Sequence, residues 1–87
     1  MEKFTTADFK AKLEDTHSFP VLYMYKFIVE ESKQDEVKEL FPGHDIKTKA
    51  SSKGKYISVT VQSMMGSSDA IIDIYLRASK IEGIIAL

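Results

Sequence analysis

The chain has 87 residues, enough for one domain near the size at which a hydrophobic core just supports independent folding. Its hydrophobic fraction of 44% and charged fraction of 29% are typical of a globular protein, and its formal net charge of −1 gives no overall positive field to attract nucleic acid or anionic lipid. It contains no cysteine, which excludes disulfides, thiolate catalysis and cysteine-ligated zinc, so we expect a cytoplasmic protein.

A short N-terminal helix is the first predicted element. Thr5 can cap it, with Asp8 three residues later, and Phe4 is spaced to pack against Phe9 across the first turn. Leu13 continues the same apolar stripe. Because the segment is brief and becomes polar afterwards, we expect an appendage that packs on the domain.

The run 19–29 predicts the first strand, because it is rich in aromatic and β-branched residues and has Pro20 at its start, where a ladder donor is dispensable. Alternation places the odd-numbered residues from Val21 to Val29 on one face. The other face carries Leu22, Met24, Lys26 and Ile28. Both faces are largely apolar, as a central strand requires.

A short helix and an edge strand are predicted next. Ser32 and Asp35 form a variant of the capping box, and Pro-Gly ends the helix after its apolar stripe of Val37, Leu40 and Phe41. The segment 44–50 then alternates apolar or small residues with charged ones. Its Lys47 and Lys49 would discourage pairing with other chains, which is typical of a sheet edge.

The rest of the chain predicts a hairpin, a helix and a final strand. A turn at 51–54 leads into a half-buried strand over 56–62, with Ile57, Val59 and Val61 on its apolar face. Met64 and Met65 are interpreted as packing residues at a corner. Ser67 or Ser68 then caps an amphipathic helix with an apolar stripe of Ile71, Ile74, Tyr75 and Ala78. The segment 84–87 is the last strand.

The order βαββαβ predicts a ferredoxin-like α+β sandwich, with helices on one face of a four-stranded antiparallel sheet in spatial order 4-1-3-2. Residues 1–18 are the predicted helical appendage, and residues 19–87 are the domain. Right-handed crossovers place the 51–55 hairpin and the start of the first domain helix at the same end of the sheet.

That end of the sheet carries a candidate site for a small anion. The segment 46–68 contains four lysines and no acidic residue. It lies near a helix start, and a helix start attracts anions. A carboxylate or phosphate could be held by Ser32, Ser51, Ser52, Lys53, Gly54, Lys55 and Tyr56. The alternative is a solubilising edge strand with an exposed loop tip.

The face of the first strand that carries Leu22, Met24, Lys26 and Ile28 is a candidate protein interface. If it points away from the helices, it leaves an apolar patch of the kind that marks a surface for a protein partner or a second copy. In the alternative, the N-terminal helix covers the patch through Phe4, Phe9 and Leu13. The sequence leaves both readings open.

Several classes of function are not expected. His17 and His44 have no second histidine at ligand spacing, so we expect no metal, and no nucleophile elbow or Gly-rich phosphate loop points to an enzyme or a cofactor. We expect no nucleic acid, because the open sheet would offer a single aromatic, Tyr56, for stacking. No apolar run approaches the ~20 residues that cross a bilayer, so we expect no membrane insertion.

The hairpin Ser51-Ser52-Lys53-Gly54-Lys55-Tyr56 followed by Ser58-Val59, together with Phe19-Pro20 and Tyr25-Lys26, resembles the YbeD-like family over about 19–87. These are small bacterial proteins of unknown function, some labelled lipoate regulatory proteins. The resemblance implies a ferredoxin-like fold close to the regulatory ACT domains. The expected function is a regulatory or adaptor role through protein association, and the alternative is an ACT-like binder of a small anionic metabolite.

Overall fold

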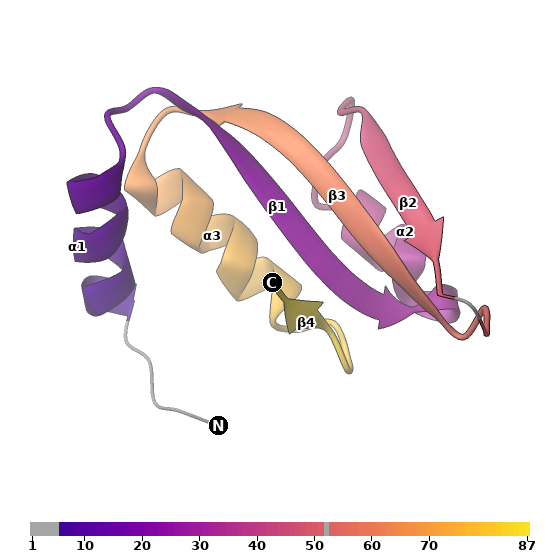
Figure 1. Cartoon of the computed structure of the whole chain (residues 1–87). Coiled ribbons are helices and arrows are strands. Elements are labelled where there is room, and N and C mark those ends of the chain that lie inside the picture. The colour runs from indigo at the N-terminus through magenta and orange to yellow at the C-terminus, as the bar shows by residue number, and fades with distance from the viewer. Residues whose placement is uncertain (1–5, 52) are drawn as a thin grey trace.

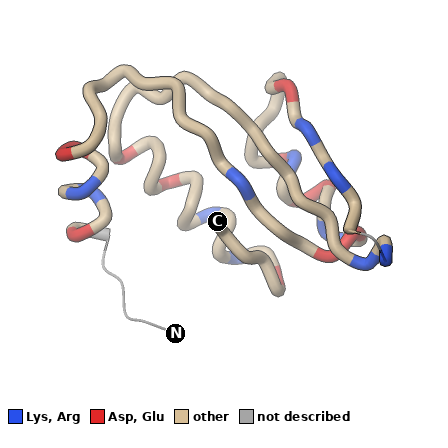
Figure 2. Tube along the Cα trace, viewed as in Figure 1, with Lys and Arg blue, Asp and Glu red and all other residues tan. Residues whose placement is uncertain are grey.

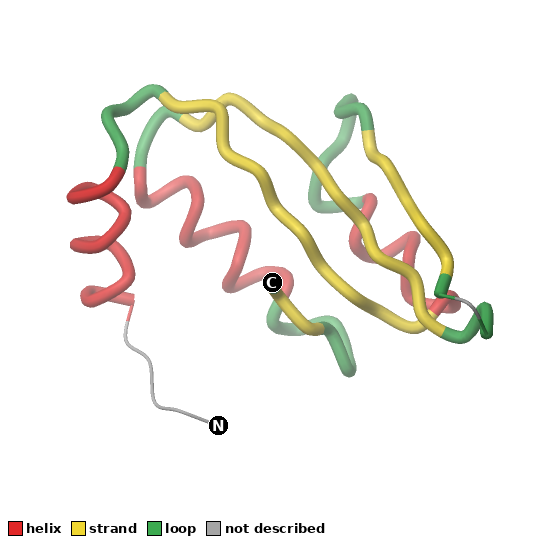
Figure 3. The backbone as a smooth tube through the Cα atoms, in the orientation of Figure 1, coloured by secondary structure: helices red, strands yellow, loops and turns green. Residues whose placement is uncertain are grey.

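The strands and helices follow one another along the chain in the predicted order. In the computed structural model, which describes residues 6–51 and 53–87, the elements are α1 (Thr6–Thr16), β1 (Val21–Glu30), η1 (Glu31–Lys33), α2 (Gln34–Lys38), β2 (Ile46–Ala50), β3 (Tyr56–Met65), α3 (Ser68–Ala78) and β4 (Ile85–Ala86). The strands form one antiparallel sheet in the order β2-β3-β1-β4, with the helices on one side (Figure 1 and Figure 3). The ferredoxin-like fold is therefore confirmed. The predicted roles of Phe4, Thr5 and Ser52 fall outside the described residues.

The two longest strands, β1 and β3, form the centre of the sheet. They pair along ten residues each, from Val21 opposite Met65 to Glu30 opposite Tyr56. β3 therefore continues beyond its predicted end. Met64 and Met65 are the last strand residues and do not form a corner, because the start of β1 extends the ladder to them. Met65 packs against the core as predicted, whereas Met64 is exposed.

The two edges of the sheet differ. All five residues of β2 pair with β3. β4 has only two residues, which pair with Phe27 and Ile28, so it is shorter than the strand predicted over 84–87. The N–H of Leu87 adds one bond, to the carbonyl of Lys26 at 2.8 Å. Among the described residues, the part of β1 before Lys26 has no strand beside it on this edge.

The core lies between the sheet and the helices. Tyr25, Phe27 and Val29 of β1 are fully buried, as are Val59 and Val61 of β3. The helix layer closes over them with Val37, Phe41, Ile71, Ile74 and Ala78. The alternation read from the sequence therefore identified the buried face of β3, and the structure shows that the odd-numbered face of β1 is the buried one of its two largely apolar faces.

α3 begins where the sequence predicts. The hydroxyl of Ser67 accepts a hydrogen bond from the N–H of Ala70 at 3.2 Å, which satisfies one of the free donors of the first turn. The predicted stripe is confirmed, since Ile71, Ile74 and Ala78 are buried and Tyr75 is half-buried. No helix among the described residues is long and apolar enough to cross a membrane.

The first crossover differs from the prediction. Ser32 lies exposed inside the 3-10 turn η1, and neither η1 nor α2 begins with a side-chain cap. The N–H of Glu31 donates instead to the carbonyl of Lys55 at 3.0 Å, so the chain passes directly from the sheet ladder into the turn. The predicted capping box of Ser32 and Asp35 is therefore wrong, because the sheet itself binds the first N–H of the turn.

α1 packs beside α3 in the helix layer (Figure 1). The rings of Phe9 and Tyr75 meet edge to face with their centroids 5.5 Å apart, and Leu13 is buried in the core. Leu22 and Met24 on the other side of the sheet remain exposed. The reading in which the N-terminal helix covers them is therefore wrong, because Phe9 and Leu13 are used on the helix side.

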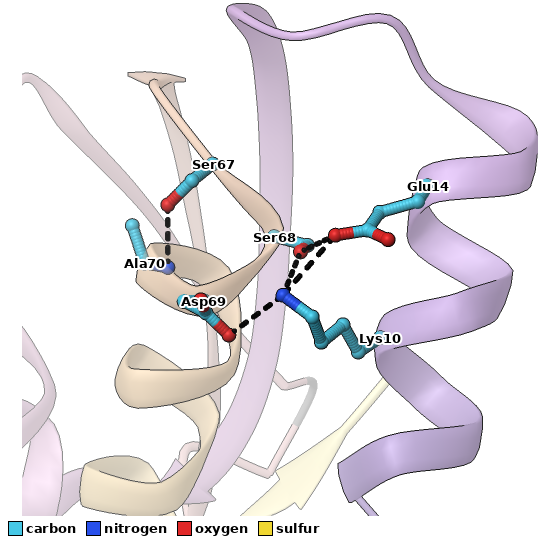
Figure 4. A network of polar contacts seen from close by, with 6 residues as sticks. All are labelled: Lys10, Glu14, Ser67, Ser68, Asp69 and Ala70. Carbon is cyan, nitrogen blue, oxygen red and sulfur yellow. Dashed lines mark hydrogen bonds and ion pairs between the residues drawn. The ribbon is translucent and has the colours of Figure 1, made fainter.

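A polar network fixes α1 to the start of α3 (Figure 4). The ammonium of Lys10 lies 3.1 Å from the carboxylate of Glu14 and 3.0 Å from that of Asp69, and it donates to the hydroxyl of Ser68 at 3.3 Å. The buried Ser68 hydroxyl donates to Glu14 at 2.7 Å. Hydrogen bonds from Ser68 and then Lys10 lower the pKa of Glu14, and the hydrogen bond with Asp69 is the largest cause that raises the pKa of Lys10.

Acid should loosen the contact between α1 and α3. Because the pKa of Glu14 is lowered from its ordinary 4.5, its contribution to stability is complete above that pH and is lost as the pH falls through the lowered value. We expect amide exchange in α1 to accelerate over this range and the Glu14→Gln variant to lose most of that dependence. The same acid response with and without Glu14 would contradict its role in the network.

Candidate functional site

The sheet has one face turned away from the helices, which we call the open face. Cross-strand pairing decides which side chains share it: Lys26 of β1 lies opposite Thr60 of β3, which in turn lies opposite Lys47 of β2. Alternation adds the other members, which are Leu22, Met24, Ile28 and Glu30 of β1, Tyr56, Ser58, Gln62 and Met64 of β3, Asp45 and Lys49 on the β2 side, and Ile85 of β4.

Exposed apolar surface gathers on the open face. Seven large apolar side chains are exposed among the described residues, and five of them stand at open-face positions in the strands: Leu22, Met24, Tyr56, Met64 and Ile85. Met64 is 64% exposed, and Leu22 and Met24 are 56% and 57% exposed. The candidate interface of Leu22, Met24, Lys26 and Ile28 therefore does lie on one face without cover from α1, and its role as an interface stays a prediction.

The open face is hollowed along β3. Two shallow cavities, of about 500 and 270 Å³, lie over this strand. Their floor is formed by β3, with short side chains at Ser58 and Thr60 and longer ones at Tyr56 and Gln62 toward the two ends, and β1 and β2 form the walls. We call this hollow the β3 trough. Its apolar wall consists of Leu22, Met24 and Ile28, and its basic wall consists of Lys47 and Lys49.

The middle of the open face is positively charged. Figure 2 shows lysines on β2 and in the middle of β1, with β3 between the two strands. None of Lys26, Lys47 and Lys49 forms an ion pair with a described residue. The acidic residues of this face stand at its ends, Asp45 before β2 and Glu30 at the end of β1. A chain of net charge −1 therefore presents three uncompensated cations together.

In the hairpin predicted to bind an anion, most of the polar groups form hydrogen bonds with one another. The N–H of Ser51 donates to the carbonyl of Tyr56 at 2.8 Å, and the carbonyl of Ser51 accepts from the N–H of Gly54 at 2.9 Å. The Ser51 hydroxyl accepts from the N–H of Tyr56 at 3.3 Å. Gly54 has a φ of +72°, which the turn requires, and the ammonium of Lys55 lies 5.8 Å from the centre of the Tyr56 ring.

The hairpin lies beside η1, as predicted, because the carbonyl of Lys55 binds the N–H of Glu31. Ser32 and Lys53 are exposed at this end of the sheet. Glu30 and Glu31 stand there too, and their carboxylates oppose an anion. The candidate ligand residues are thus brought together except for Ser52, which is not described, and anion binding stays a prediction.

Both histidines lie in loops and pack against other side chains. Nδ1 of His44 lies 3.1 Å from the carbonyl of Pro42, which only accepts, so Nδ1 carries the proton and Nε2 accepts from the hydroxyl of Ser63 at 2.8 Å. Ser63 is buried, so this pair fastens the loop before β2 to β3. His17 packs edge to face on Tyr23. Within residues 6–51 and 53–87, no group of three His, Cys, Asp or Glu residues could hold a metal ion.

Three tyrosines meet in the core. The hydroxyls of Tyr23 and Tyr75 lie 3.2 Å apart, whereas the buried hydroxyl of Tyr25 has no hydrogen-bond partner among the described residues. Burial raises the pKa of both Tyr25 and Tyr75 above the ordinary value, and the hydrogen bond between Tyr75 and Tyr23 adds to the shift of Tyr75. Both hydroxyls therefore stay protonated at neutral pH, and neither is available as a base.

A third cavity was not predicted from the sequence. It has a volume of about 680 Å³ and lies on the helix side, between α1, α3 and the end of the chain. Its lining contains no charged residue and includes Phe9, Phe27, Tyr75, Ile81 and Ile84. These residues come from distant segments and each reads as ordinary core, so only the packing of α1 beside α3 reveals the cavity.

Comparison with known proteins gives the family and no activity. Residues 14–87 match a family described as a protein of unknown function, DUF493. A UPF0250 protein of Shewanella piezotolerans is 34% identical over 80 residues, which cover 84% of this chain and 91% of that protein. No solved structure matches the chain. The match confirms the resemblance to the YbeD-like proteins, and the chain belongs to the DUF493 family of small proteins of unknown function.

Proposed function

We propose that this protein is a small non-enzymatic regulatory or adaptor domain that associates with another protein through the open face of its sheet. The observation that carries the proposal is the gathering of exposed large apolar side chains on this one face. Scattered apolar residues are normal on a protein surface, but a contiguous exposed patch usually marks the contact surface for a partner.

Two further features support the proposal. The helices α1, α2 and α3 all pack on the opposite side of the sheet, so no described element covers the open face. The face also combines apolar side chains with unpaired lysines, and interfaces that form and separate usually mix an apolar centre with polar surroundings. An extended contact with another protein uses both components at once.

Site-specific photo-crosslinking tests the proposal. A photoreactive amino acid at position 64 or 24, in the full chain in its native cells, should give covalent adducts with a protein. The matched control is position 76, because Leu76 is also an exposed large apolar residue, 49% exposed, but lies on α3. If positions 24 and 64 give no adduct, or no more than position 76, the protein does not act through this face.

A further inference from the structure

We infer that the β3 trough binds an acidic amphipathic α-helix of a partner protein, with apolar side chains on one flank and aspartate or glutamate on the adjacent flank. The inference rests on the proposed function and specifies the chemistry of the partner. It follows from the distribution of side chains across the open face: apolar on β1 except for Lys26, short and polar at the middle of β3, and basic on β2.

An α-helix is wide enough to span the β3 trough and reach both of its walls. β1 and β2 are separated by two strand spacings, roughly 9–10 Å, and an α-helix with its side chains is about 10–12 Å across. Ser58 and Thr60 keep the floor low, so a helix laid along β3 would contact both walls. Its apolar flank would meet Leu22 and Met24, and its other flank would meet Lys47.

Charge decides what the second flank must carry. Lys47 and Lys49 stand two residues apart on the same side of β2, and Lys26 faces Lys47 across Thr60. These like charges have no acidic partner among the described residues, so carboxylates from outside would relieve their repulsion. Asp45 lies at one end of the basic wall, which places the acidic groups of the partner nearer Lys49.

Other occupants fit the β3 trough less well. A second copy of this chain would have to supply an acidic helix, yet on α1 and α3 Glu14 and Asp69 are held by Lys10 and Asp73 by Arg77 at 3.3 Å. The helix α2 carries Asp35 and Glu36 but has only five residues, too few to lie along the trough. A nucleic acid would find an apolar wall opposite the lysines and a single aromatic side chain, Tyr56, for stacking at one end of the trough.

Designed peptides test the inference. The probe is a helical peptide of about 18 residues, roughly 27 Å long, with leucines on one flank and glutamates on the next. In titrations of the isotope-labelled full chain, it should shift the NMR signals of Thr60, Met24 and Lys47. A peptide with lysine in place of glutamate should bind the natural chain at least about tenfold more weakly.

Charge reversal in the protein supplies the matched test. The double variant Lys47→Glu, Lys49→Glu should lose at least about tenfold in affinity for the glutamate peptide and gain affinity for the lysine peptide. Lys12→Glu with Lys38→Glu makes the same change of charge on the helix side, so its affinity for the peptide should change by less than about twofold. All four side chains are exposed, so we expect every variant to fold.

The results separate this inference from the proposed function. Equal affinities for the two peptides, or equal effects of the two double variants, would overturn the inference that the partner is an acidic helix. The inference would also fail if a short RNA or a second copy of the chain shifted the same NMR signals and bound more tightly than the glutamate peptide. If that happened while positions 24 and 64 still gave crosslinked adducts, the proposed protein association would be retained and only the acidic helix would be rejected. If no adducts formed either, both the proposed function and the inferred partner would be rejected.

Discussion

Replacing Phe27 with alanine should lower the free energy of unfolding by about 3–5 kcal/mol. Phe27 is fully buried at the centre of β1, and its ring lies 5.9 Å from that of Tyr75 and 6.4 Å from that of Phe41, measured between centroids. It also lines the apolar cavity on the helix side, so truncation would enlarge an existing void. In a small domain whose total stability is about 5–15 kcal/mol, this loss would remove a large part of that stability.

Urea denaturation followed by circular dichroism measures the loss of stability in Phe27→Ala. Leu76→Ala is the matched control, because it also removes a large apolar side chain, but from an exposed position on α3, and should change stability by less than about 0.5 kcal/mol. Equal effects of the two substitutions would mean that the buried face of β1 is assigned incorrectly.

Replacing Tyr25 with phenylalanine should raise the free energy of unfolding by about 1–3 kcal/mol, the usual penalty for a buried polar group without a partner. The Tyr25 ring is fully buried, and its hydroxyl has no hydrogen-bond partner among the described residues. The substitution removes the hydroxyl and keeps the ring contacts with Phe41 and Tyr75 at 5.0 and 5.5 Å.

Tyr75→Phe is the matched control for Tyr25→Phe. Its hydroxyl lies 3.2 Å from that of Tyr23, so its removal breaks a hydrogen bond and should lower stability by about 1 kcal/mol. Opposite signs for two chemically identical changes would be hard to obtain from any general effect of removing a hydroxyl. A Tyr25→Phe protein that unfolds more easily than the natural one would show that this hydroxyl is hydrogen-bonded in solution.

The layout of the domain could be predicted from local patterns. Alternation divided β1 into two apolar faces without deciding which is buried, but it identified the buried face of β3, and the stripe of Ile71, Ile74 and Ala78 identified the buried side of α3. These patterns succeed because burial against one partner layer acts on each residue separately. The cap at Ser32 failed because the N–H that begins η1 is bound by Lys55, a residue more than twenty positions away that no local pattern includes.

The position of α1 could not be predicted for a similar reason. Phe9 and Leu13 would fit either apolar surface of the domain, and the choice depends on the polar network of Lys10 with the start of α3. The β3 trough was also missed, although Leu22, Met24 and Ile28 were singled out. Its basic wall becomes visible only when the register places Lys47 beside Thr60, which is a property of two strands and not of either sequence alone.

The shortness of β4 has a consequence for how copies of this chain meet when they are crowded. The carbonyl of Lys26 points toward β4, so the main-chain groups of Leu22 and Met24, at alternate positions of the same strand, point beyond that edge as well. At the opposite edge, Lys47 and Lys49 of β2 discourage pairing with another chain, whereas the exposed first half of β1 carries only uncharged side chains. Cross-β aggregation of the folded protein should therefore begin at the first half of β1, and a single lysine there would act as a gatekeeper.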